Sequence, residues 1–166
     1  MREISPRVCG DHVLGTGFSN GAAMVHRWGC EGTQVDAIAP VSGTLMVDTC
    51  QGPPVPVRHY HGTDDPVVPG DGSPGKGIHD IVYTSVDDTM AAWRERNLCS
   101  DDDPKITITG DTTCTQWICA APTEQCWIEG WGHRWPGGPN RSQTDANATL
   151  AIWEWFATTI DASSLR

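Results

Sequence analysis

The sequence feature that most constrains the fold is Gly17-Phe18-Ser19-Asn20-Gly21, which places one serine between two glycines, after an apolar run and before a helix-like segment. This is the pattern of a nucleophile elbow, a turn from strand to helix so tight that side chains two residues before and after the serine would meet neighbouring backbone. The serine then lies at the carboxyl end of a strand and at the start of a helix, where free backbone N–H groups favour an oxyanion. With 18 glycines in 166 residues the motif by itself is weak, so its surroundings decide its meaning.

Length and charge limit the possible classes of protein. A chain of 166 residues with 38% hydrophobic content predicts one globular domain over residues 1–166. Its 11 basic and 21 acidic residues give a net charge of −10, which repels nucleic acid and anionic membrane surfaces. The sequence has no apolar run of about 18 residues that could span a bilayer, and residues 1–20 lack the apolar core of a secretion signal.

Seven cysteines indicate disulfides, because they do not form the paired C-x-x-C knuckles that hold zinc. The spacing suggests nested bridges Cys114–Cys119 and Cys99–Cys126, a third bridge Cys30–Cys50, and Cys9 left over. Oxidised cysteines predict an exported, extracellular protein. The alternative is that several of them are buried thiols.

Short apolar runs, separated by helical or loop segments, favour a parallel sheet covered on both faces. Strands are predicted at 11–16, 35–41, 55–60 and 126–130, with a hairpin over 105–120 around Gly110-Asp111. Helices are predicted at 22–30, 85–98 and 145–160. The second of these has a capping-box-like start at Ser85 and Asp88, and one face of it carries Val86, Met90, Trp93 and Asn97. No repeat or long linker divides the chain, so the fold class is α/β.

An acid and a histidine follow the serine in the order that serine hydrolases of parallel sheets use. A serine hydroxyl needs a base to take its proton and a carboxylate to orient that base. The strand at 55–60 leads into a loop with Asp64 and Asp65, and the last core strand leads into His133. All three groups follow strand ends, where ligands of an α/β sheet bind.

These residues resemble the extracellular polyhydroxybutyrate depolymerase-like and feruloyl-esterase-like serine esterases of the α/β-hydrolase fold. The resemblance rests on segments 15–21, 38–43, 61–69, 132–138 and 151–156. It implies that Ser19 is the nucleophile, Asp65 the acid and His133 the base of a catalytic triad, and that the N–H of Asn20 is an oxyanion donor. The implied function is hydrolysis of a carboxylic ester, either of a hydroxyalkanoate polymer or of a hydroxycinnamate on a polysaccharide, with no metal and no cofactor.

Several assignments have plainer alternatives. Ser19 could be an ordinary helix N-cap, Asp64 could replace Asp65, and His133 could be a satisfied loop histidine. His59 and His61 share one face of a strand and could bind a metal, although no third histidine ligand is evident. The tryptophans that flank His133, Trp131 and Trp135, form either an aromatic wall for substrate or part of the core.

The chain departs from this family before the elbow. A complete member has several strands and an oxyanion loop there, whereas only 18 residues precede Ser19. The chain is therefore expected to be an N-terminally truncated member that lacks the second oxyanion donor, whose loss costs about 3 kcal/mol, so that its turnover alone is poor. The alternatives to an esterase are a non-catalytic remnant or binding module of the same fold, and a peptidase with the same triad.

Overall fold

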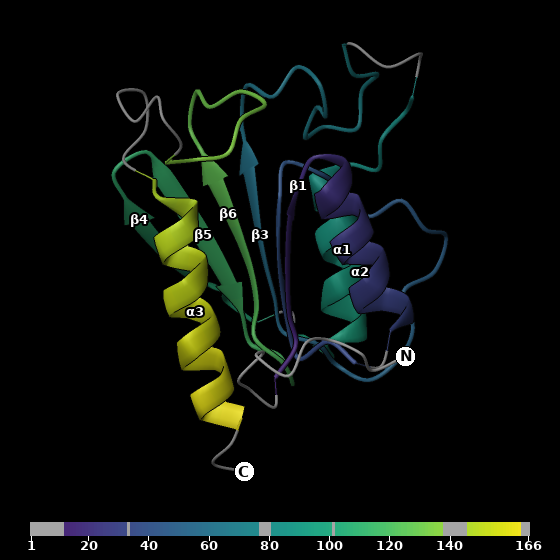
Figure 1. The fold of residues 1–166 in the computed structure, drawn as a ribbon, viewed down its shortest axis with the longest axis vertical. Helices are drawn as coiled ribbons and strands as arrows, with labels where there is room; N and C mark the ends of the chain where they lie inside the picture. Colours follow the sequence, from purple (N-terminus) through teal and green to yellow (C-terminus); the bar gives the residue numbers. More distant parts are fainter. Residues whose placement is uncertain (1–11, 33, 77–80, 101, 138–145, 164–166) are drawn as a thin grey trace, which may run out of the picture.

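The computed structural model describes residues 12–32, 34–76, 81–100, 102–137 and 146–163, which form an α/β structure with one mixed sheet (Figure 1). The strands are β1 (Leu14–Phe18), β2 (Ala37–Val41), β3 (Val57–Gly62), β4 (Lys105–Thr109), β5 (Thr112–Trp117) and β6 (Thr123–Ile128). The helices are α1 (Asn20–Glu31), α2 (Val86–Arg96) and α3 (Ala148–Ser163). None of the helices in the described ranges is both long and apolar enough to cross a bilayer.

The sheet has the strand order β1-β2-β3-β6-β5-β4. Strands β1, β2, β3 and β6 are parallel, while β5 pairs with both β6 and β4 in antiparallel register. The prediction of a mostly parallel core with an added hairpin around Gly110 is therefore confirmed. Since β1, β3 and β6 run in the same direction, the loops that follow them lie at one edge of the sheet.

The two faces of the sheet have separate cores because alternate residues of a strand point to opposite faces. In β2, Ala37, Ala39 and Val41 pack in one cluster with Ile152 and Phe156 of α3. The intervening Ile38 packs in the other cluster with residues of α1 and α2. Helices therefore cover both faces, with α3 on one and α1 and α2 on the other (Figure 1).

Helix α2 follows its sequence signals closely. The Ser85 side chain accepts a hydrogen bond from the backbone N–H of Asp88, as in a capping box. The predicted apolar face, which comprises Val86, Met90, Trp93 and Asn97, is at most 2% exposed. The buried Asn97 amide has hydrogen-bond partners there: its Oδ1 accepts from the Val55 N–H, and its Nδ2 donates to the Val55 carbonyl.

The element boundaries differ from the predictions by a few residues. Strand β6 begins at Thr123 rather than 126, because it continues its parallel register with β3 as far as Val57. Helix α1 begins directly at Asn20, and α3 extends past the predicted end at 160. The predicted first residue of that last helix, Asp145, and the beginning of the strand predicted at 11–16 lie outside the described residues.

Within the described residues the structure has three disulfides: Cys30–Cys50, Cys99–Cys119 and Cys114–Cys126. The prediction for Cys30 and Cys50 is confirmed, whereas the nested pairing of the other four cysteines is wrong. The reason is the sheet register, which places Cys114 of β5 directly opposite Cys126 of β6. Cys119 follows β5 and meets Cys99 just after α2. Cys9 lies outside the described residues.

Disulfide mapping is expected to recover these three pairs. Digestion without reductant must include cleavage after Trp117, which separates Cys114 from Cys119, and after Glu124, which separates Cys119 from Cys126. Mass spectrometry should then detect Cys114 linked to Cys126. Reduction of this disulfide should lower the free energy of unfolding, since closing the loop between two cysteines 12 residues apart contributes about 3 kcal/mol. A peptide in which Cys114 is linked to Cys119 would contradict the observed register.

Candidate active site

Ser19 lies at the turn between β1 and α1 in a backbone conformation that non-glycine residues rarely adopt. Its φ is 57° and its ψ is −122°, a sparsely populated region that costs of order 1–3 kcal/mol. The Ser19 N–H donates to the Val41 carbonyl at 2.9 Å, so the pairing of β1 with β2 continues to this residue. Its side chain makes no capping hydrogen bond to α1. Ser19 therefore occupies the N-cap position of α1 without capping the helix through its side chain.

Two glycines let the backbone close around Ser19. A Cβ at Gly17 would collide with the carbonyl of Gly21, and a Cβ at Gly43 would collide with the carbonyl of Ser19. A Cβ at Gly21 would meet no described atom within 4 Å, so the expected crowding after the serine is wrong for that position. The second close approach comes from the end of β2 rather than from the motif itself.

The side chains of Ser19, His133 and Asp65 form one hydrogen-bonded chain. The Ser19 Oγ lies 2.8 Å from His133 Nε2, and His133 Nδ1 lies 2.8 Å from Asp65 Oδ2. Phe18 packs against the imidazole, with the two ring centroids 4.8 Å apart. Since a carboxylate only accepts, His133 in its neutral form carries its proton on Nδ1 and presents a lone pair to the serine hydroxyl.

Asp65 is 4% exposed, and its surroundings favour the ionised carboxylate. Burial alone raises the pKa of Asp65, but hydrogen bonds from His133 and from the N–H groups of Val68 and Val67 outweigh it and hold the pKa below its ordinary value. The two N–H groups both reach Oδ1 at 2.9 Å. Asp64, in contrast, is exposed and accepts only a 3.4 Å hydrogen bond from Thr63. Of the two candidate acids, only Asp65 contacts His133.

Backbone contacts hold the acid loop against the histidine loop. The Asp64 N–H donates to the Trp131 carbonyl at 3.1 Å, and the Gly130 N–H donates to Thr63 Oγ1 at 2.8 Å. Gly62 ends β3 where a Cβ would collide with the Trp131 carbonyl. Asp65 and His133 therefore meet because the loops after β3 and β6 are bonded to each other.

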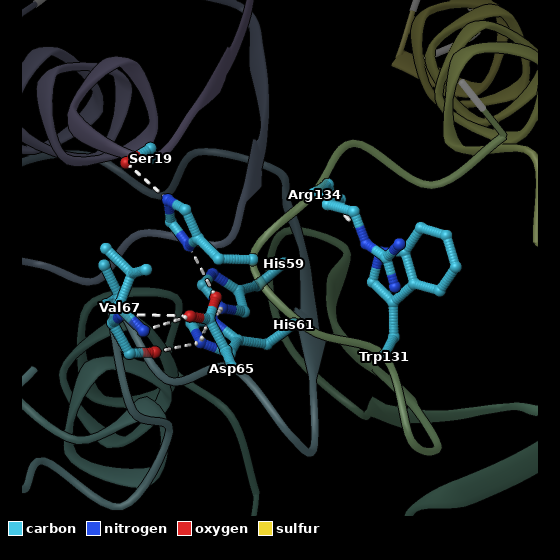
Figure 2. A network of polar contacts seen from close by, with 9 residues as sticks. Ser19, His59, His61, Asp65, Val67, Trp131 and Arg134 are labelled. Carbon is cyan, nitrogen blue, oxygen red and sulfur yellow. Dashed lines mark hydrogen bonds and ion pairs between the residues drawn. The ribbon is translucent and has the colours of Figure 1, made fainter. Parts of the chain in front are cut away.

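The two tryptophans beside His133 do not line the cavity at Ser19. Trp131 is 3% exposed, packs in the core on the α3 side of the sheet, and donates to the Arg134 carbonyl. Figure 2 shows its ring, with Arg134 stacked over it, at a distance from Ser19. Trp135 is partly buried and donates to Thr149. Trp131 is thus a core residue, and the substrate-wall interpretation fails for it.

A cavity of about 380 Å³ opens next to Ser19. Asn20 borders this cavity, and because it is the first residue of α1 its N–H has no acceptor within the helix. Most of the remaining lining is apolar: Ala23, Met24, Met46, Val67, Val68, Ile81 and Tyr83, with Arg27, Gly43 and Thr44. The composition of this cavity was not evident in the sequence, since its walls come from four separate segments.

His59 and His61 are completely buried and already use their ring nitrogens. His59 contacts His26 through Nδ1 and His61 through Nε2, each at 3.1 Å, and His61 Nε2 contacts the Val68 carbonyl at 2.8 Å. These contacts leave no free lone pair for a metal. Among the described residues the one metal-like cluster is Cys114, Glu124 and Cys126, whose sulfurs form a disulfide.

Burial keeps these imidazoles neutral. It lowers the pKa of His26 to about 3, although a hydrogen bond to the backbone of Gly43 opposes the change. Burial, together with His26 and His61, holds the pKa of His59 well below its ordinary value. The pKa of His61 is also lowered by burial, although the Val68 carbonyl and Asp65 oppose the shift.

Acid is therefore expected to destabilise the protein at a pH well above the ordinary range of carboxylates. Below about pH 6.5 the unfolded chain binds more protons at these three histidines than the folded chain does, so the free energy of unfolding falls by up to about 1 kcal/mol per pH unit for each histidine. Guanidinium titrations between about pH 8 and pH 5 measure this slope. Over that range Asp65 stays ionised, and Glu124, whose pKa is raised by burial, acts in the opposite direction. A midpoint that stays constant or rises on acidification would contradict the neutral histidines.

The arrangement has the parts needed to activate a hydroxyl. A serine oxygen contacts an imidazole nitrogen, and the imidazole contacts a carboxylate that is held ionised, so the serine proton has a base to accept it and a charge to stabilise the product. A scan against models of protein families finds no match to this chain, and a search of curated proteins finds no significant match.

Proposed function

We propose that this protein is a serine esterase of the α/β-hydrolase type that cleaves carboxylic esters through an acyl-enzyme. The observation that carries the proposal is the continuous hydrogen-bonded chain from Ser19 through His133 to Asp65. Ser19 follows β1, Asp65 follows β3 and His133 follows β6, and these three strands are parallel. The order along the chain is therefore serine, acid, histidine. The strained φ of Ser19 also supports it, because such strain collects at functional sites.

In the proposed reaction the Ser19 Oγ attacks the acyl carbon while His133 Nε2 takes the hydroxyl proton. Asp65 stabilises the imidazolium, which then gives its proton to the departing alcohol. The backbone N–H of Asn20 donates to the oxyanion of the tetrahedral intermediate. Water, deprotonated by the same imidazole, hydrolyses the acyl-Ser19 bond and restores the free serine.

The lining of the cavity beside Ser19 favours an ester that carries an apolar acyl chain or an aromatic group. Met24, Met46, Ile81 and Tyr83 supply flexible and aromatic surface there. A short hydroxyalkanoate unit and a hydroxycinnamoyl group are both of this kind, and they are the proposed substrate classes. The three disulfides support an extracellular location for this reaction.

A panel of substrates tests the proposed function. The panel comprises p-nitrophenyl esters of increasing chain length, methyl ferulate, soluble hydroxybutyrate oligomers and a peptide p-nitroanilide. The proposal expects hydrolysis of esters above the rate of a Ser19→Ala blank, and none of the anilide. Folded protein that cleaves none of the esters above the blank would overturn the esterase assignment, and cleavage of the anilide alone would indicate a peptidase.

A further inference from the structure

Three buried histidines form a second hydrogen-bonded chain behind the candidate active site. Trp93 Nε1 lies 2.9 Å from His26 Nδ1, His26 Nε2 lies 3.1 Å from His59 Nδ1, and His59 Nε2 lies 3.1 Å from His61 Nδ1. The chain ends where His61 Nε2 meets the Val68 carbonyl at 2.8 Å. All three histidines are 0% exposed, and none belongs to the serine, histidine and aspartate group described above.

The two ends of this chain fix the proton positions within it. An indole N–H only donates, so His26 Nδ1 must accept from Trp93. A peptide carbonyl only accepts, so His61 Nε2 must donate to Val68. One assignment satisfies both ends and the two contacts between them: each imidazole is neutral, accepts through Nδ1 and donates through Nε2. A second proton on any of the three would set two donors against each other.

The same ends exclude a path for protons. A proton that moved along the chain would have to enter from an indole nitrogen or leave through a peptide carbonyl, and neither group ionises at ordinary pH. His61 Nε2 does lie 3.7 Å from Asp65 Oδ2, but its proton already points to the Val68 carbonyl. The chain is therefore suited to holding groups in place rather than to moving charge.

The groups that the chain connects are the helix of the nucleophile and the loop of the acid. His26 lies seven residues after Ser19 on α1, which is two helical turns along the same side of the helix. At the other end Val68 accepts from His61 and, through its own N–H, donates to Asp65 Oδ1 at 2.9 Å. Figure 2 shows His61 and Val67 on either side of Asp65, with Ser19 at the far end of the network.

We propose that His26, His59 and His61 are positioning residues that fix the distance and orientation between Ser19 and Asp65. This role rests on the proposed function of Ser19. Two routes therefore join Ser19 to Asp65. The first is the pair of hydrogen bonds through the imidazole of His133. The second follows the backbone of α1 from Ser19 to His26 and then the hydrogen bonds through the three histidines and Val68 to Asp65. The reacting groups are aligned only when both routes hold Ser19 and Asp65 at the same distance and orientation.

Breaking the buried route is expected to slow the reaction more than it weakens substrate binding. If the Val68 carbonyl loses its donor, the loop that holds the Asp65 carboxylate can shift, and a displacement of about 1 Å at a reacting group can cost on the order of a hundredfold in rate. None of the three histidines lines the cavity beside Ser19. The effect should therefore appear mainly in kcat and in the rate at which Ser19 reacts, with a smaller change in KM because Val68 lines the cavity.

The first test is the tautomeric state of the wild-type histidines, measured by long-range proton–nitrogen NMR. His26, His59 and His61 should each be neutral with the proton on Nε2, while neutral His133 should carry its proton on Nδ1 and serves as an internal reference. A proton on Nδ1 of any of the three, or a doubly protonated ring at neutral pH, would overturn the proposed arrangement.

The second test measures how fast a fluorophosphonate labels Ser19 in His59→Leu, which keeps the bulk of the side chain and removes both contacts. Labelling and kcat should fall by a factor on the order of a hundred, with KM within about threefold. Ile38→Ala is the matched control, because Ile38 is buried in the same core cluster as Trp93 but its aliphatic side chain takes part in none of the chain's hydrogen bonds. It should lower the melting temperature and leave labelling below that temperature unchanged.

Trp93→Phe keeps the test decisive if His59→Leu does not fold, because it removes only the terminal donor and retains an aromatic ring. Its labelling should be slower than that of Ile38→Ala at equal folded fraction. Folded His59→Leu or Trp93→Phe that labels at the wild-type rate would overturn the positioning role alone. Wild-type protein that has the stated tautomers but is not labelled would instead overturn the proposed function, and with it this role.

Discussion

Replacement of Ser19 by alanine is expected to lower kcat/KM for p-nitrophenyl esters by at least a thousandfold, and by as much as about 10⁶-fold. The Ser19 Oγ is the only oxygen that the structure places 2.8 Å from His133 Nε2, so no other described hydroxyl can replace it. The remaining activity would come from His133 acting on water and from substrate binding. Initial rates at high enzyme concentration, with circular dichroism to confirm folding, measure the loss.

Ser42→Ala is the matched control for this variant. Ser42 directly follows the neighbouring strand β2, is 1% exposed, and has a positive φ of 52° like that of Ser19. Its hydroxyl has no hydrogen-bond partner among the described residues. The same chemical change at Ser42 should leave the rate within a few fold of wild type. Equal losses at the two positions would show that folding, and not the nucleophile, was affected, and a Ser19→Ala rate within tenfold of wild type would exclude Ser19 as nucleophile.

The second large effect is expected at Asp65. Asparagine keeps the shape of this side chain, but its amide nitrogen can face His133 Nδ1 and force the proton onto Nε2, where the imidazole can no longer accept from Ser19. The charge that stabilises the imidazolium is lost as well. Asp65→Asn should therefore lower kcat by a factor on the order of 10⁴.

Asp64→Asn supplies the comparison, because Asp64 is the adjacent carboxylate in the same loop and is exposed. Its substitution should change kcat by no more than about threefold. The two variants are best compared in kcat under identical conditions, since only the Asp65 carboxylate contacts the His133 imidazole. Similar losses in both variants would contradict the assignment of Asp65 as the partner of His133.

Local sequence patterns were sufficient to predict the elements around the site. The elbow at Gly17–Gly21, the strand before the acid loop and the face of α2 that carries Met90 and Trp93 were each indicated by a pattern of residues close together in the sequence. The order of Ser19, Asp65 and His133 along the chain predicted which side chains lie close together. Such predictions succeed because parallel strands bring their carboxyl ends to one edge of the sheet.

Features that depend on tertiary register could not be predicted in this way. The pairing of Cys114 with Cys126 follows from which residues of β5 and β6 face each other, and spacing along the chain does not determine it. The crowding at Gly43 arises from β2, 24 residues after Ser19 in the sequence. The burial of Trp131 depends on where α3 packs.

The buried histidine chain shows the same limit. The alternation of β3 indicated only that His59 and His61 share a face of the strand, which is equally consistent with a metal site. His26 gave no separate signal within its helix, and the residue that bonds it, Trp93, lies 67 residues away. Only the packing of α1 and α2 against the same face of the sheet brings these four side chains together.

The most direct test of the central claim is the site at which a fluorophosphonate modifies the wild-type protein. Ser19 is the only serine in the tryptic peptide that spans residues 8–27, so its modification is unambiguous in a peptide map. The account predicts one adduct per chain, located on Ser19, which disappears in Ser19→Ala and forms much more slowly in Asp65→Asn. Folded wild-type protein that acquires no adduct, or acquires it on another residue, would contradict the assignment of Ser19 as the nucleophile.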